Sequence, residues 1–287
     1  MKLSVSSYSY SRTTRNDDEK AISLAAKQGF AGIEFAEIHP KEGFSKTDWA
    51  RELARQADEN GLEIVSYSIG GNLLAGELDK EVERLCREVD VAAALGSKRM
   101  RHDVAYGYDR PESSYMGFDN ALDRLASGCR AVTEYAAGKG VVTMTENHGR
   151  FCQESARIER LVNAVCHPNF GALIDVGNFL CADDEPAAAT GRLAPYAKHV
   201  HVKDFHVKSG NGFVPPDGFF SSRGGMRLRG AVIGHGDVPV LGCLRALADA
   251  GYDGWLSIEF EGMEDPETGV LFGKHSLEKM LDRSLGL

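Results

Sequence analysis

Eight short apolar segments alternate along the chain with stretches in which apolar residues recur at helical spacing. Two of these stretches, Glu19–Gln28 and Glu77–Leu95, each predict an amphipathic helix. Strands that alternate with helices predict a parallel sheet in which the helices make the crossover connections. The predicted strands are Leu3–Tyr8, Gly32–Phe35, Glu63–Ser68, Ser97–His102, Val141–Glu146, Gly171–Asp175, His199–His201 and Trp255–Glu259.

A glycine marks the junction between a helical stretch and the next strand in five of these units. Glycine at such a junction commonly adopts the left-handed conformation that ends a helix, and we expect this conformation at all five positions. The repeated helix–glycine–strand unit predicts a (β/α)8 TIM barrel. A doubly wound open sheet would show the same alternation, but eight units favour a closed barrel. The five glycines are Gly29, Gly61, Gly96, Gly140 and Gly251.

Four of the predicted strands end on a residue whose side chain can bind a metal ion: Glu146, Asp175, His201 and Glu259. The carboxyl ends of barrel strands meet at one face, so these side chains are expected to converge there. Three carboxylates and an imidazole suit one hard or borderline divalent cation, with Mn²⁺ as the first choice and Mg²⁺, Co²⁺ or Zn²⁺ as alternatives. Any one of these residues could instead cap a helix or lie in a solvated loop. Four strand ends in succession argue against that interpretation.

The spacing of the same residues predicts a long insertion after the seventh strand. Glu146 and Asp175 are 29 residues apart and Asp175 and His201 are 26 apart, but His201 and Glu259 are 58 apart. The excess lies in residues 205–239, which are rich in glycine, proline and aromatic residues. Long loops on this face of a barrel usually act as lids or contact surfaces. We therefore expect the insertion to border the site and to offer a surface for a second copy of the chain or a partner subunit.

Length and composition favour one globular domain. The 287 residues fit a single barrel spanning 1–287, and the formal net charge of −9 disfavours nucleic acids and anionic membranes as partners. The chain has no apolar run long enough to span a membrane, and its first residues lack the apolar core of a signal peptide. Six scattered cysteines without a C-x-x-C pair are typical of reduced thiols. The expected location is the cytoplasm.

Four segments around the strand ends resemble the signature blocks of a known family. They are Thr145–Gly149, Ile174–Asn178, Val200–Asp204 and Ser257–Gly262. These blocks are similar to those of the xylose-isomerase-like TIM-barrel superfamily. That group includes sugar phosphate isomerases and epimerases, ketose 3-epimerases, inosose and dehydroshikimate dehydratases, and enzymes of the AP endonuclease 2 type. The resemblance implies that the four strand-end residues bind the metal ion. It also implies that Glu146 and Glu259 transfer protons on opposite sides of a sugar.

Five further residues are candidates for catalysis or substrate binding. His148 follows Glu146 by two residues and should point to the same side, where an imidazole can act as an acid or base near neutral pH. In the dehydratase branch of the superfamily, a Glu-x-His of this type is associated with such a role; a hydrogen-bonded loop histidine is the alternative. The candidate substrate contacts are Glu34, His102, Lys203 and Arg229, each of which could instead make a structural hydrogen bond or ion pair.

Two reaction classes fit these residues. The leading interpretation is a metal-dependent isomerase or epimerase that removes a proton next to the carbonyl of a keto- or aldo-sugar and forms an enediolate. The rival is a lyase that begins with the same step and then expels a neighbouring substituent. It would be an inosose- or dehydroshikimate-type dehydratase, or a subunit that cleaves 3-oxo-glycosides or C-glycosides. The lyase needs an acid for the leaving group, and His148 and His102 are candidates.

Two other interpretations are weaker. In the AP endonuclease branch the position three residues after Asp175 is a histidine, but here it is Asn178, and the chain is acidic. In the second interpretation, the barrel serves only as a binding or assembly subunit. The four strand-end residues would then hold no metal ion. Failure of the protein to bind metal would support that reading.

Overall fold

The computed structural model describes residues 1–284, in which eight parallel strands close into a barrel. Each strand pairs with its neighbours along the chain, and the last strand closes the barrel by pairing Val5 with Ile258. The predicted closed (β/α)8 barrel is confirmed. Its strands are β1 (Lys2–Ser6), β2 (Gly32–Ala36), β3 (Glu63–Ile69), β4 (Arg99–His102), β5 (Val142–Glu146), β6 (Phe170–Asp175), β7 (Ala197–Val202) and β11 (Trp255–Ile258).

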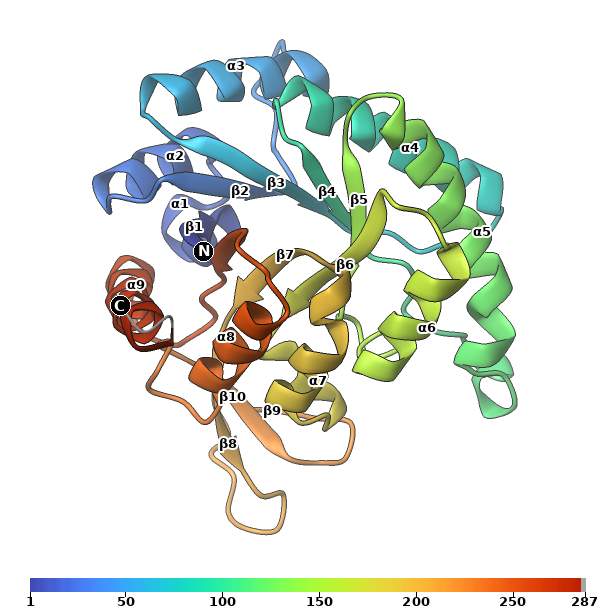
Figure 1. Cartoon of the computed structure of the whole chain (residues 1–287), viewed down its shortest axis with the longest axis vertical. Helices are drawn as coiled ribbons and strands as arrows, with labels where there is room; N and C mark the ends of the chain where they lie inside the picture. Colours follow the sequence, from blue (N-terminus) through green and yellow to red (C-terminus); the bar gives the residue numbers. More distant parts are fainter. Residues whose placement is uncertain (285–287) are drawn as a thin grey trace.

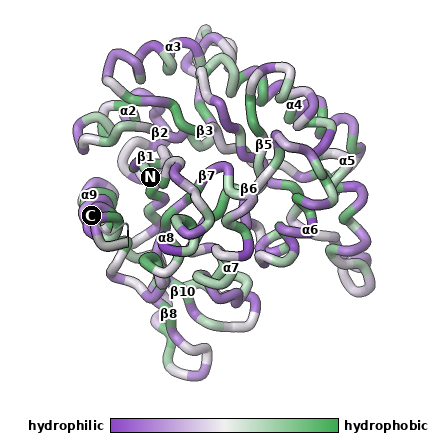
Figure 2. The backbone as a smooth tube through the Cα atoms, viewed as in Figure 1, coloured by the Kyte–Doolittle hydropathy of each residue, from purple (hydrophilic) through white to green (hydrophobic). Residues whose placement is uncertain are grey.

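Helices surround the barrel as an outer ring (Figure 1). The longer helices carry both hydrophobic and hydrophilic residues (Figure 2); in the helix Leu78–Ala94, for example, Leu85 and Val89 are buried. None of the described helices is both long and apolar enough to cross a membrane. The helices are α1 (Ser11–Thr14), α2 (Asp18–Lys27), α3 (Lys46–Glu59), α4 (Leu78–Ala94), α5 (Phe118–Ala137), α6 (Ser155–Val165), α7 (Pro186–Leu193), α8 (Val240–Asp249) and α9 (Pro266–Ser284).

The glycine junctions have the expected backbone conformation. All five predicted glycines have positive φ angles, from 69° at Gly29 to 81° at Gly251. Residues with a Cβ rarely adopt this conformation, so glycine at these positions lets the chain turn from a helix into the next strand. The sequence pattern that predicted the barrel therefore has a direct conformational cause.

The first strand is shorter than the predicted Leu3–Tyr8. It ends at Ser6, and Ser7–Tyr10 form a 3₁₀ turn. The Ser9 hydroxyl donates to the carbonyl of Ile258 and accepts from the N–H of Phe260, which ties this turn to the end of β11. The turn bends the chain over the mouth of the barrel and brings Tyr8 to the pocket described below.

The insertion after β7 is more ordered than the predicted loop. It contains β8 (Asp204–Lys208), β9 (Phe220–Ser221) and β10 (Arg227–Ala231), which form an antiparallel sheet in the order β8-β10-β9. The Asp204 carboxylate anchors this sheet, because it accepts hydrogen bonds from the backbone N–H groups of Gly234, Gly236 and Val238. The sheet was missed because its strands are short, and Gly and Arg interrupt the alternation of apolar and polar residues.

Candidate active site

A cavity of about 330 Å³ opens at the face of the barrel where the strands end. This is the face at which the chemistry of TIM barrels is found. Residues from seven of the eight barrel strands or the segments that follow them reach it. The side chains used in the argument below are Tyr8, Glu34, Arg101, Glu146, His148, His201, Lys203, Glu259 and Glu261.

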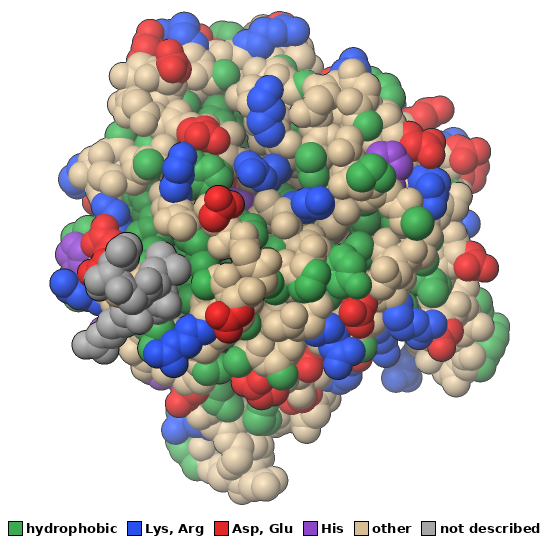
Figure 3. Space-filling model, viewed as in Figure 1, with side chains coloured by type: hydrophobic (Ala, Val, Ile, Leu, Met, Phe, Trp, Pro, Cys, Tyr) green, Lys and Arg blue, Asp and Glu red, His purple; other side chains and the backbone are tan. Residues whose placement is uncertain are grey.

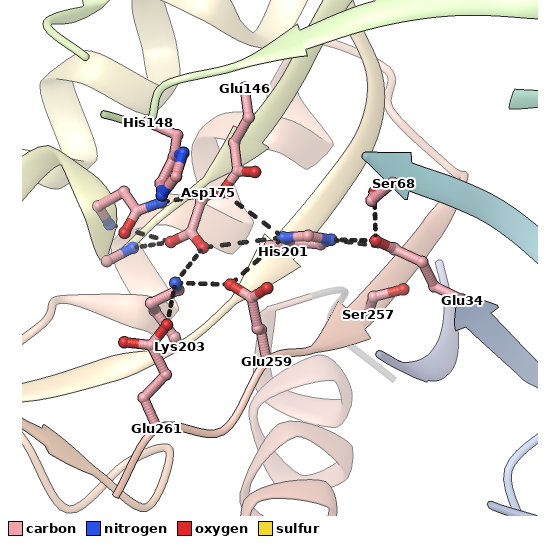
Figure 4. A network of polar contacts seen from close by, with 12 residues as sticks. Glu34, Ser68, Glu146, His148, Asp175, His201, Lys203, Ser257, Glu259 and Glu261 are labelled. Atoms are coloured by element: carbon pink, nitrogen blue, oxygen red, sulfur yellow. Dashed lines mark hydrogen bonds and ion pairs between the residues drawn. The ribbon is translucent and has the colours of Figure 1, made fainter. Parts of the chain in front are cut away.

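The four predicted metal ligands converge at the floor of this cavity (Figure 4). One ligand atom from each of Glu146, Asp175, His201 and Glu259 lies within 4.8 Å of the others. Nδ1 of His201 is 3.7 Å from Glu146 Oε1, 3.9 Å from Asp175 Oδ2 and 3.6 Å from Glu259 Oε2. These separations exceed a hydrogen bond, so the four atoms surround a small space without closing it.

Glu34 holds the imidazole of His201 from behind. Nε2 of His201 lies 2.8 Å and 2.9 Å from the two carboxylate oxygens, which also bind Ser68 and His199. Burial opposes ionisation of Glu34, but the two histidines outweigh it and keep its pKa below the ordinary value. Glu34 lines the cavity and both of its oxygens already accept hydrogen bonds, so a substrate contact at Glu34 stays a prediction. Its role in the structure is to direct Nδ1 of His201 toward the three carboxylates.

Backbone and amide groups fix the other ligands. Oδ1 of Asp175 accepts from the N–H groups of Gly177 and Asn178 at 2.8 and 2.9 Å, which leaves Oδ2 facing the cluster. The side chain of Asn147 makes two hydrogen bonds to the backbone of Asp175. Asn178, which stands where the nuclease branch carries histidine, donates to Glu146 at 2.8 Å. Asn178 therefore acts as a support for a carboxylate.

A further argument against a nuclease, that the chain lacks an Asp-x-His pair after His201, is wrong, because Asp204 and His206 form such a pair. In this structure, however, the Asp204 carboxylate is bound to backbone N–H groups of the insertion. It is therefore committed to holding the β8–β10 sheet in place.

Two buried cations border the cluster. Nη2 of Arg101 is 2.6 Å from Glu146 and 2.9 Å from Asp103. Nζ of Lys203 is 2.5 Å from Glu259, 3.2 Å from Asp175 and 3.0 Å from Glu261.

Lys203 reaches the cluster because residue 177 is glycine. A Cβ at that position would lie only 2.5 Å from Cγ of Lys203, so a larger residue would displace the lysine.

The charges of the site set the ionisation of the carboxylates. Burial would raise the pKa of Glu146 and Glu259, but Arg101 beside the first and Lys203 beside the second outweigh it. The pKa of Glu146 is held well below its ordinary value, and that of Glu259 falls to about 2. Burial raises the pKa of Asp175 to about 7, since Lys203 offsets only part of this and the two glutamates add to it. Negative charge at this point is thus incompletely balanced.

The donor set fits a divalent cation. Nδ1 of His201 and Oδ2 of Asp175 are buried, and neither makes a hydrogen bond within residues 1–284, although the ammonium of Lys203 lies 3.2 Å from Oδ2. Buried polar atoms without partners are costly, and these two face the same small space. A cation there would satisfy both atoms and balance the excess negative charge. Carboxylate oxygens and one imidazole suit Mn²⁺ or Mg²⁺ better than Zn²⁺.

His148 lies at the side of the cavity and forms a pair with a residue that the sequence argument overlooked. Its Nδ1 is 3.0 Å from Oδ1 of Asp103, and the imidazole is 44% exposed. Burial would lower its pKa, but the hydrogen bond to Asp103 and the charge of Glu146 outweigh it and raise the pKa above the ordinary value. An exposed imidazole held by a carboxylate can deliver or accept a proton.

Of the three other predicted substrate contacts, one lines the central cavity and two do not. Lys203 borders the cavity as expected. His102 is fully buried, with Nδ1 bonded to the carbonyl of Asp103, and lies outside the cavity lining. Arg229 covers the ring of Phe219 and contacts Met263, also outside the central cavity. The structure thus gives no support for substrate contacts at His102 or Arg229.

The residue of β4 that lines the cavity is Arg101, next to the predicted His102. Successive side chains of a strand point to opposite faces of the sheet. A candidate residue that is wrong by one position therefore lies on the face away from the cavity. Alternation counted back from Asp103 at the barrel mouth would have selected Arg101. Glu261, two residues after Glu259, follows the same rule.

Comparisons with known proteins agree with this geometry. The model of the xylose isomerase-like TIM barrel family matches residues 22–280. The inosose dehydratase of Clostridium botulinum (strain Alaska E43 / Type E3) is 24% identical over 259 residues, spanning 88% of this chain and 84% of the relative. The structure of L-ribulose 3-epimerase superposes with a TM-score of 0.76 at 17% identity, covering 99% of this chain and 95% of that one. D-Psicose 3-epimerase from Clostridium cellulolyticum H10 superposes with a TM-score of 0.71 at 21% identity, with the same coverage. These two structural likenesses establish the shared fold.

Proposed function

Because the chain belongs to the xylose isomerase-like TIM barrel family, we propose that it is a divalent-metal-dependent enzyme that isomerises or epimerises a sugar. The reaction would begin with removal of a proton from the carbon next to the sugar carbonyl. One observation carries the proposal: Nδ1 of His201 makes no hydrogen bond within residues 1–284 and faces three carboxylates, while Glu34 holds the opposite nitrogen. Relatives named as inosose dehydratases and ketose epimerases support a sugar as the substrate.

The residues that would hold the cation are Glu146, Asp175, His201 and Glu259. A bound divalent cation would polarise the carbonyl and stabilise the negative charge that develops on its oxygen. We propose Mn²⁺ as the resident ion, because the site is rich in oxygen ligands.

Glu146 and Glu259 would move the protons. They lie on opposite sides of His201 (Figure 4), and the low pKa of each keeps it ionised at neutral pH. An ionised carboxylate on one face of the sugar can accept the proton. The carboxylate on the other face must first take up a proton from water, and it can then return that proton to the sugar. Return from the opposite face inverts the carbon, whereas return to the neighbouring carbon isomerises the sugar.

A second function, elimination, is favoured by the Asp103–His148 pair. After the first proton is removed, a lyase must protonate the group that leaves. The imidazole of His148 is exposed to the cavity and its pKa is raised, so it can carry that proton near neutral pH. The dehydratase names of the curated relatives agree with this alternative.

A substrate panel tests the two functions. The Mn²⁺-loaded protein would be incubated with free ketoses, sugar phosphates, inosose and 3-oxo-glycosides, and the products identified by NMR after the metal is removed. A rearranged sugar supports isomerisation or epimerisation, and loss of water or of an aglycone supports elimination. If every substrate is returned unchanged, the proposed substrate class is wrong.

A further inference from the structure

We infer that the substrate carries a second, ring-sized apolar group, which lies in a side cavity walled by Tyr8, Phe220 and Met263. The inference rests on the proposed function, because it assigns this cavity to the same substrate that reacts beside His201. It narrows the substrate from a free sugar to a keto-sugar with an apolar substituent, such as an aryl glycoside.

The side cavity adjoins the reaction site. It has a volume of about 340 Å³, and Tyr8 and Glu261 line both it and the central cavity of about 330 Å³. Sites that enclose a small molecule usually measure about 300–1,000 Å³, so the central cavity alone is at the lower limit. The two together have room for a sugar ring and a second ring beside it.

Three of the side chains that line the side cavity are large, apolar and exposed, beside polar residues such as Ser9 and Ser11. Tyr8 is 46% exposed, Phe220 38% and Met263 54%. Single exposed apolar side chains are ordinary on a protein surface. Here, however, three of them come from separate segments and line one cavity next to a polar site. Aromatic and thioether side chains in this arrangement offer a flat, apolar ligand a surface to cover.

The insertion supplies the central wall of this cavity. Phe220 stands on β9, opposite Leu228 of β10. The ring of Phe205 packs edge-on against Phe220 with centroids 5.6 Å apart, which fixes the position of the exposed ring. The small sheet that interrupts the regular barrel thus presents an aromatic side chain beside the site.

Glycines keep the side cavity open. Gly218 has a φ of +77°, and a Cβ there would lie 2.5 Å from Sδ of Met263. A Cβ at Gly230 would lie 2.2 Å from the backbone oxygen of Glu261. Both glycines line the cavity, so larger residues at these positions would displace its walls.

The charges of the cavity disfavour a phosphate group as its occupant. Arg12 is the basic residue that lines it within the described chain, and its Nη2 already donates to the carbonyls of Gly262 and Glu264. Glu261 adds a negative charge to the border with the reaction site. Glu261 repels an anion, and Nη2 of Arg12 is committed to backbone carbonyls, whereas an uncharged apolar group meets neither constraint.

Binding of two unreactive probes tests the inference. Phenyl glucoside and methyl glucoside share the sugar but differ in the apolar group, and neither carries the ketone. Their dissociation constants would be measured by calorimetry on the Mn²⁺-loaded protein. The variants would be Phe220→Ala, Met263→Ala and the control Phe213→Ala, since Phe213 is 86% exposed in the same insertion but outside the cavity lining. The 3-oxo forms of both glucosides would be assayed for proton exchange in parallel.

We expect the phenyl probe to bind about tenfold more tightly than the methyl probe. Phe220→Ala and Met263→Ala should each remove most of this preference without affecting the methyl probe, and Phe213→Ala should affect neither. If Phe220→Ala fails to fold, Met263→Ala examines the same cavity. Equal affinity for the two probes, including absence of binding by both, contradicts the inference. If the two probes bind equally but the 3-oxo glucosides still exchange their protons, the inference fails and the proposed function stands. If the phenyl probe binds selectively but neither 3-oxo glucoside exchanges, the proposed function fails and the assignment of the side cavity stands.

Discussion

His201 and Glu34 form a buried pair in which Nε2 of the imidazole lies 2.8 Å and 2.9 Å from the two carboxylate oxygens. The pair determines which nitrogen of His201 faces the three carboxylates of the site. A metal-binding histidine commonly has its second nitrogen fixed by a carboxylate in this manner. Glu34 comes from β2 and His201 from β7, so the two residues are far apart in the sequence. The local sequence around Glu34 therefore does not identify it as a support for a metal ligand.

Replacement of this supporting carboxylate should weaken metal binding. We expect Glu34→Gln to lower the affinity for Mn²⁺ by about 10–100-fold, because Gln cannot hold the imidazole in the same way. The affinity would be measured by calorimetry. Glu37→Gln is the control, since Glu37 lines the same cavity but pairs with Lys46 at 3.2 Å. Equal affinities of Glu34→Gln and the wild-type protein would contradict the assigned role.

Removal of either proton-transfer carboxylate should stop the reaction. Glu146→Gln and Glu259→Gln are each expected to abolish turnover and to weaken metal binding while the fold survives. The amide keeps the shape of the side chain, but it neither binds the cation as strongly nor accepts a proton. Turnover and circular dichroism would be measured for each variant. Unchanged activity in either variant would refute the site.

His148 should contribute through proton transfer. We expect His148→Ala to lower kcat by about 10²–10⁴-fold, the usual contribution of a positioned acid or base. His275→Ala, which changes an exposed histidine on α9, is the control. A change of less than about threefold in kcat would assign His148 to a structural role.

The ion pair between Asp103 and Arg101 should make stability depend on pH. Burial would raise the pKa of Asp103, but Arg101 and His148 outweigh it and hold the pKa below the ordinary value of 3.8. The unfolded chain therefore binds more protons near that pH, so stability rises with pH. The contribution of Asp103 is fully present at pH 7 and is lost as the pH falls below about 4.

Asp103→Asn should accordingly reduce the free energy of unfolding by about 2 kcal/mol at pH 7 and by less at pH 3. Urea unfolding at the two pH values would measure this difference. Asp119→Asn is the control, because Asp119 is 74% exposed in its pair with Arg160. A loss of the same size at both pH values would contradict the pKa assignment.

The barrel and the four strand-end residues were predictable because both depend on local patterns. Gly29 and the four similar glycines mark helix ends through their backbone conformation. Glu146 and Asp175 end strands whose carboxyl termini must meet at one face of any barrel. Chain position alone therefore brings these residues together.

The remaining parts of the site depend on contacts that local sequence does not encode. Arg101 was missed in favour of His102, because the face that a strand residue occupies is set by pairing with neighbouring strands. The link between Glu34 and His201 joins residues 167 positions apart. The pairing of β9 with β10 likewise depends on tertiary contacts. Strand β9 has only two residues, which is too few to show an alternation of apolar and polar side chains.

Hydrogen–deuterium exchange tests the central proposal of metal-dependent proton abstraction most directly. A keto-sugar that the enzyme accepts would be incubated in D₂O with the Mn²⁺-loaded protein, the metal-free protein and the Glu146→Gln and Glu259→Gln variants. We predict that deuterium enters at the carbon next to the carbonyl only with the metal-loaded wild-type protein. Exchange that persists at the same rate without metal, or in both glutamine variants, would contradict the proposal.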